Sequence, residues 1–171
     1  MSDQDRCRWV EFYKLKFKGK FFIPLSNASK TFVLMGRTEY GFLGHYNKYK
    51  RSPFETFYMG GDGMTGYTTY GTETIGLRGY ENGSLTPTAS YYRNGSLQSA
   101  QIGYVYTRVG VELRYPLLLE QTTNIYALTF LDAGNCWSTG KEFSPFDLKR
   151  SAGVGVRIFL PMFGLLGIDW A

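Results

Sequence analysis

The sequence predicts an all-β protein: an antiparallel transmembrane β-barrel fragment of about six strands, with one long loop inserted into the barrel lumen. Apolar and polar residues alternate over segments of about ten to twelve residues, which is the period-two pattern of strands. Short and long connections alternate along the chain, as they do in membrane barrels. Aromatic residues make up 18% of the chain, which suits the aromatic girdles at the two membrane interfaces.

The first two strands are expected at residues 9–23 and 31–43, and each separates two different faces. In the first, lysines alternate with large apolar residues; the lysines are Lys14, Lys16, Lys18 and Lys20. In the second, an apolar face opposes a face that carries Arg37 and Glu39. The apolar faces are expected to contact lipid and the charged faces to line the lumen.

The later strands are expected at residues 104–115, 124–137, 151–160 and 165–171. The strand at 104–115 alternates most regularly, with valines on one face and Glu112 on the other. The strand at 124–137 is less regular but places Asp132 on the face of Tyr126 and Phe130. On the 104–115 strand, the lumen-side Gly110 is expected to tolerate alanine far better than the lipid-side Val111 tolerates arginine.

Strand length distinguishes a membrane sheet from a soluble β-sandwich, which would show a similar alternation. Strands of soluble proteins usually run about 5–6 residues. Strands of about ten to twelve residues, at roughly 3.3 Å per residue and tilted, cover the ~25 Å apolar band of an outer membrane. Short connections near 24–30, 116–124 and 161–164 are expected on the periplasmic side, and long ones near 45–102 and 138–150 outside the cell or in the lumen. The β-sandwich remains the alternative fold.

Composition argues against several other classes of protein. The net charge is +5, yet the basic residues do not form a patch interleaved with stacking aromatics, so nucleic-acid binding is not expected. Cys7 and Cys136 are far apart and have no metal-ligand spacing, and His45 is the only histidine. No apolar run approaches the ~18 residues of a membrane helix. We expect no catalytic residues, no metal and no cofactor.

A candidate site joins the long loop to two strands. Arg78 lies on a glycine-rich stretch of the loop, and Glu112 and Asp132 share the lumen face of neighbouring strands. Like charges across a strand pair are destabilising unless a cation lies between them, and a guanidinium can bind both carboxylates in a forked geometry. The alternative is that strand arginines neutralise the acids: Arg108 or Arg114 beside Glu112, and Arg157 across from Asp132.

Four motifs along the chain resemble a known family when taken in order and spacing. They are Phe57–Gly61, Leu77–Tyr80, Phe130–Trp137 and Ser151–Arg157. Together they are similar to the C-terminal barrel of the BamA family, the outer-membrane protein assembly factors of the bacterial surface antigen superfamily. The resemblance runs from about Trp9 to Ala171.

The resemblance implies a site and an architecture. In the family, an Arg-Gly-aromatic motif tips an extracellular loop that folds back into a barrel of about sixteen strands. The motif corresponds here to Leu77, Arg78, Gly79 and Tyr80. Leu77 and Tyr80 replace the usual valine and phenylalanine. The family's arginine contacts acids on the following two strands, which correspond to Glu112 and Asp132.

The resemblance also implies a function that is not enzymatic: insertion of nascent outer-membrane proteins into the bacterial outer membrane. The implied partners are outer-membrane lipids and lipopolysaccharide, nascent substrates, periplasmic POTRA domains and accessory assembly lipoproteins. A two-partner-secretion transporter and the barrel of a surface-antigen or lipase autotransporter are the alternatives. About six strands cannot close a barrel, so we expect residues 1–171 to be part of a longer protein or a truncated gene product.

Overall fold

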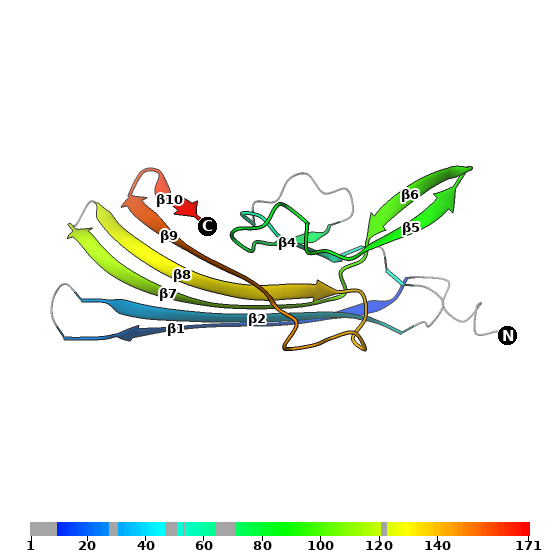
Figure 1. Ribbon diagram of the computed structural model, residues 1–171, viewed down its shortest axis with the longest axis horizontal. Helices are drawn as coiled ribbons and strands as arrows, with labels where there is room; N and C mark the ends of the chain where they lie inside the picture. The colour runs from blue at the N-terminus through cyan, green and yellow to red at the C-terminus, as the bar shows by residue number, and fades with distance from the viewer. Residues whose placement is uncertain (1–9, 28–30, 47–50, 53, 64–70, 121–122) are drawn as a thin grey trace.

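The computed structural model describes residues 10–27, 31–46, 51–52, 54–63, 71–120 and 123–171. Six long strands form one antiparallel sheet in the order β1-β2-β7-β8-β9-β10. Figure 1 shows this sheet as a curved layer with the long loop on its concave side. The prediction of an all-β, antiparallel, partial barrel is confirmed; the sheet does not close.

The long strands lie close to the ranges expected from the alternation. Their bounds are β1 Phe12–Pro24, β2 Val33–His45, β7 Val105–Leu119, β8 Asn124–Trp137, β9 Lys149–Leu160 and β10 Gly164–Trp170. Strand β7 extends past Tyr115 because it continues through a register shift between Pro116 and Leu118. Proline cannot donate to a ladder, and such irregularities are where sheets accommodate it.

The two faces of the sheet differ as the alternation predicts. One face is exposed and apolar along its whole width; its exposed residues include Leu15, Phe17, Phe21, Val111, Leu131, Val154 and Ile168. The other face holds the buried charged side chains Glu39, Glu112 and Asp132. An apolar outer face and a polar inner face are the arrangement of a membrane barrel wall. Among the described residues, the chain contains no helix that is long and apolar enough to cross a membrane.

The long loop has its own secondary structure, which the alternation did not predict. Strands β3 Phe57–Met59 and β4 Glu73–Ile75 pair in parallel and form a short ribbon. Strands β5 Thr88–Arg93 and β6 Ser96–Gln101 form a hairpin that projects from one end of the molecule (Figure 1). Asn94 and Gly95 both have positive φ at its turn, which is the type I′ geometry that favours this dipeptide.

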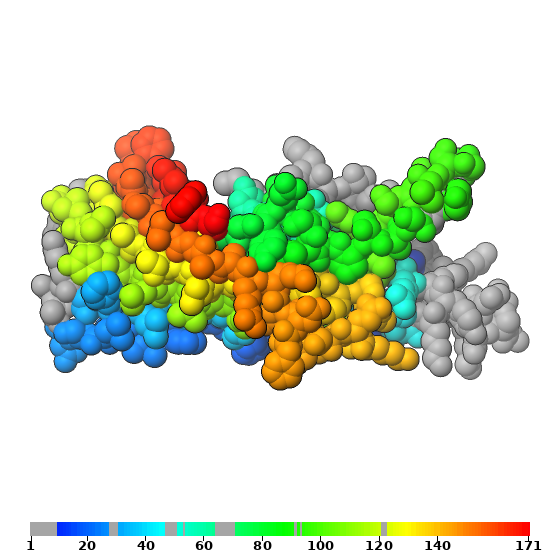
Figure 2. Space-filling view, in the orientation of Figure 1, coloured from blue at the N-terminus to red at the C-terminus, as the bar shows by residue number. Residues whose placement is uncertain are grey.

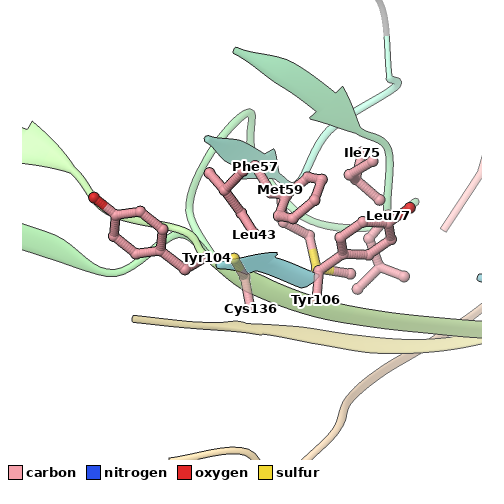
Figure 3. Packing of buried hydrophobic residues seen from close by; sticks show 8 residues of the cluster. All are labelled: Leu43, Phe57, Met59, Ile75, Leu77, Tyr104, Tyr106 and Cys136. Atoms are coloured by element: carbon pink, nitrogen blue, oxygen red, sulfur yellow. The ribbon is translucent and has the colours of Figure 1, made fainter. Parts of the chain in front are cut away.

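A small apolar core fastens the ribbon to the sheet. Phe57, Met59 and Leu77 from the loop are completely buried. They pack against side chains of the sheet and its edges, as Figure 3 shows; these are Leu43, Tyr104, Tyr106 and Cys136. Full burial of one side chain of this size contributes about 1.5–3 kcal/mol relative to leaving it exposed. In the space-filling view of Figure 2, the loop residues lie directly on the sheet between β10 and the projecting hairpin.

Candidate functional site

The tip of the long loop approaches the middle of the sheet. Leu77 is fully buried and forms an isolated bridge with Gly61, which fixes the backbone just before Arg78. Gly79 has φ of +82°, and a Cβ at this position would lie 3.1 Å from the Ser151 Cβ. The loop therefore needs glycine after the arginine, both for the left-handed backbone and for the close approach to β9.

Arg78 binds both of the acids that share its face of the sheet. Its Nε donates to Asp132 Oδ2 at 2.7 Å, and its Nη2 donates to Glu112 Oε1 at 2.8 Å. The Asp132 side chain is 0% exposed and that of Glu112 is 4% exposed. Glu112 is paired with Phe130 and Asp132 with Gly110, so the two acids are diagonal neighbours on β7 and β8. One guanidinium thus joins the loop to two strands.

An aromatic ring lies beneath the guanidinium. The Arg78 Cζ is 3.6 Å from the centroid of the Phe130 ring, which is within the range of cation–π contacts. The ring covers Gly153 of β9, where a Cβ would lie only 2.5 Å from Phe130 Cζ. Tyr80 adds a hydrogen bond from its hydroxyl to the Arg150 carbonyl oxygen at 2.9 Å. The loop tip is therefore held by polar contacts to β7, β8 and β9.

The strand arginines also bind these acids, so the two interpretations are not exclusive. Arg114 donates to Glu112 Oε2 at 2.9 and 2.6 Å. Arg108 lies 3.7 Å from Glu39 of β2, not beside Glu112. The expectation that Arg157 lies across from Asp132 is wrong, because Ser151 occupies that position. Arg157 instead forms a paired contact with Asp169 of β10 at 2.6 Å.

Sequence reasoning missed two residues of the site. Arg37 of β2 donates to both oxygens of Asp132 at 2.7 Å, and Asp169 of β10 lies 3.6 Å from Arg78 Nη1. Both residues are on the lumen face by alternation, which was the available signal. The site therefore extends from β2 to β10, rather than across β7 and β8 alone.

Charge and burial oppose one another at Arg78. Burial disfavours the cation and by itself lowers the pKa of Arg78, but the hydrogen bonds and charges of Asp132 and Glu112 outweigh it, so the pKa is raised. The guanidinium stays charged throughout the physiological pH range. Below the loop tip is a cavity of about 780 Å³, lined among others by Lys20, Arg37 and Arg157. This cavity allows water to approach the ion pairs and reduces their strength.

Gly110 forms the floor of this arrangement. A Cβ at Gly110 would lie 2.4 Å from Asp132 Oδ1 and 2.8 Å from Arg37 Nε. Alanine at this position therefore requires the Asp132 or the Arg37 side chain to shift, and the lower cost of Gly110→Ala relative to Val111→Arg stays a prediction. The shorter of the two contacts is to the carboxylate that Arg78 and Arg37 share, so a methyl group here presses on the Asp132 end of the ion pairs.

Within the described residues, no group of three or more His, Cys, Asp or Glu side chains is placed to hold a metal ion. Cys136 is a buried free thiol in the apolar core, and Cys7 lies outside the described residues. The polar chemistry of the site is thus that of shared ion pairs between loop and wall.

Comparison with known proteins agrees with this architecture. Residues 7–171 match the Omp85 superfamily domain. Over 151 residues, or 87% of the chain, the sequence is 32% identical to the outer membrane protein assembly factor BamA of Neisseria meningitidis serogroup B (strain ATCC BAA-335 / MC58). The chain spans 16% of the length of that relative. The resemblance to the BamA family is confirmed, and the chain belongs to the Omp85 superfamily of the bacterial outer membrane.

Proposed function

We propose that this chain is part of the barrel of a factor that folds and inserts β-barrel proteins into the bacterial outer membrane. The observation that carries the proposal is the loop tip: a motif arginine, Arg78, is seated on Glu112 and Asp132 in the lumen of an Omp85 domain. The similarity to an outer membrane protein assembly factor supports the same function. Residues 1–171, whose six long strands form one sheet, are then one part of a larger barrel.

The proposed activity is physical, not enzymatic. A sheet edge offers backbone donors and acceptors to an incoming strand, which is the principle of β-augmentation. The apolar outer face contacts outer-membrane lipids and lipopolysaccharide. Nascent outer-membrane proteins are the substrates, and periplasmic POTRA domains and accessory lipoproteins are partners of the whole protein. The seated loop keeps this part of the wall rigid while another edge exchanges strands.

Depletion of the protein that carries this chain tests the function. We expect the folded, heat-modifiable forms of several unrelated porins to fall together in the outer membrane, with unfolded precursors accumulating in the periplasm. A two-partner-secretion transporter would produce a different result: one exported polypeptide is retained, while porin assembly continues at its normal rate. Normal porin assembly after depletion would contradict the proposal.

We propose a topology to accompany the function. The short β1–β2 connection, with Asn27, faces the periplasm, and the β5–β6 hairpin, with Ser96, faces the outside. Gln121, expected in the next periplasmic turn, lies outside the described residues. In a variant without Cys7 and Cys136, an impermeant thiol reagent on whole cells should label Ser96→Cys and not Asn27→Cys. Labelling of position 27 with none at position 96 would reverse the topology.

A further inference from the structure

A row of lysines on the edge strand β1 lies on the lumen face of the sheet and contacts the loop. Lys14 Nζ lies 2.9 Å from Glu55 Oε2 and 3.1 Å from Glu73 Oε2. Lys16 Nζ lies 2.9 Å from the same Glu73 oxygen, and Lys18 Nζ lies 3.6 Å from Glu73 Oε1. One loop carboxylate, that of Glu73, therefore lies within ion-pair distance of three lysines at alternate positions of β1.

The Lys14–Glu73 contact is more sheltered than an ordinary surface ion pair, whereas Lys16 and Lys18 are 38% and 50% exposed. The side chain of Glu73 is 22% exposed and that of Lys14 is 14% exposed. The Lys14 ammonium also lies 4.8 Å from the centroid of the Phe57 ring, within the range of a cation–π contact. Phe57 and Glu73 are directly paired in the β3–β4 ribbon. Lys14 thus contacts both strands of the ribbon.

We infer that Glu73 is a positioning residue that, with Lys14, Lys16 and Lys18, forms a second anchor for the long loop. This anchor is on β1, whereas Arg78 is anchored on β7 and β8, and β2 separates the two sites in the sheet. The apolar core around Phe57 lies between them. The inference goes beyond the proposed function, since it concerns how the loop is seated and holds whatever substrate the barrel serves.

Because the two anchors are on separate strands, one segment of the loop can detach from the sheet while the other stays bound. Loss of the Glu73 anchor should free the β3–β4 ribbon while Arg78 still holds the tip. Without Glu73, Lys16 loses the acid that it contacts, and among the described residues the acids that still pair with this row of ammonium groups are Glu55 and Glu39. Local opening of a segment, rather than unfolding of the whole sheet, is the expected consequence.

Amide hydrogen exchange of the full-length protein in lipid nanodiscs measures this opening directly. The reporters are amides that hold the ribbon: Glu73 N donates to Thr56 O at 2.9 Å, and Gly60 N donates to Ile75 O at 3.0 Å. Glu73→Gln should accelerate their exchange roughly two- to tenfold, the range of a partly buried ion pair. Amides of β7 and β8 should not change.

A charge swap distinguishes an ion-pair role of Glu73 from a structural role that does not depend on its charge. Glu73→Lys should accelerate ribbon exchange further, and adding Lys16→Glu to it should restore much of the protection. Glu120→Gln, in the exposed β7–β8 connection, removes the same charge and should leave the ribbon unchanged. Unchanged ribbon exchange in Glu73→Gln and Glu73→Lys would overturn the inference, as would a swap that restores nothing. Because no substrate is present, failure here is distinct from failure of the assembly function.

The pH dependence of exchange provides a further check. Burial by itself raises the pKa of Glu73, but the hydrogen bonds and charges of Lys16 and Lys14 outweigh it, so the pKa lies below its usual 4.5. The anchor therefore stabilises the loop fully above pH 4.5 and is lost as pH falls through the lowered pKa. The other charged or titratable groups facing Glu73 are Lys18, Glu39, Glu55, Tyr106 and Arg108. The difference between wild type and Glu73→Gln should vanish in acid; a constant difference would contradict a charge effect.

Discussion

Replacing Arg78 with alanine should release the loop tip from the barrel wall while the six long strands stay folded. The substitution leaves the fully buried Asp132 and the nearly buried Glu112 without their shared cation. Breaking a buried ion pair from one side costs ~3–5 kcal/mol. The open cavity below the tip gives solvent access to the site and lowers that figure. Arg37 and Arg114 still bind one acid each, so the cost falls on the loop rather than on the sheet.

Limited proteolysis of the loop and amide exchange of residues 76–80 measure the release. Arg78→Lys should recover only part of the protection, because an ammonium cannot bind two carboxylates in a fixed fork. Arg157→Ala is the matched control: Arg157 contacts Asp169 rather than Asp132, so the loop tip should stay protected. Protection that survives in Arg78→Ala but is lost in Arg157→Ala would transfer the role to the strand arginines.

Gly110→Ala tests the same lock from the strand side. Its methyl group must displace Asp132 Oδ1, which a Cβ would approach to 2.4 Å. We expect the loop tip to loosen as in Arg78→Ala, although no charge changes. A Gly110→Ala variant with a fully protected loop would show that the carboxylate can move without losing Arg78.

Val111→Arg should destabilise the folded sheet by ~2–4 kcal/mol, the cost of a charged side chain on the lipid face near the bilayer midplane. Val111 is 45% exposed on the outer face, and its neighbour across the ladder, Leu131, is 64% exposed. It lies near the middle of the membrane-facing length of β7, where the guanidinium has the longest path to water. Denaturant midpoints in micelles and the heat-modifiable shift on gels report the change.

Val111→Leu is the control for size, because it keeps the side chain apolar and adds one methylene. It should shift the midpoint by a small fraction of the arginine effect. The loop reporters should remain protected in Val111→Arg wherever the sheet is folded, since Val111 points away from the lumen. Equal stability of the arginine and leucine variants would mean that this face does not contact lipid.

The alternation of apolar and polar residues was sufficient to predict the long strands and their faces. Side chains alternate strictly along a strand, so runs of about ten to twelve residues assigned each residue to lipid or lumen without knowledge of the fold. The same parity placed Glu112 and Asp132 on one face. The short β7–β8 connection then brought Glu112 opposite Phe130 and left Asp132 one diagonal away. Side-chain parity and a short connection were therefore sufficient to predict that Glu112 and Asp132 are neighbours.

Which charged side chains pair with one another depends on the folded sheet. The connection from β8 to β9 is long, so its length does not set the register, and Ser151 rather than Arg157 came to lie opposite Asp132. Arg37 reaches Asp132 across the intervening strand β7 because Gly110 leaves room there. The β3–β4 ribbon places Glu73 next to the lysines of β1. Its two strands are far apart in the sequence, so no periodic pattern predicts their pairing. Contacts between distant segments depend on register, curvature and loop path, and these are properties of the folded sheet.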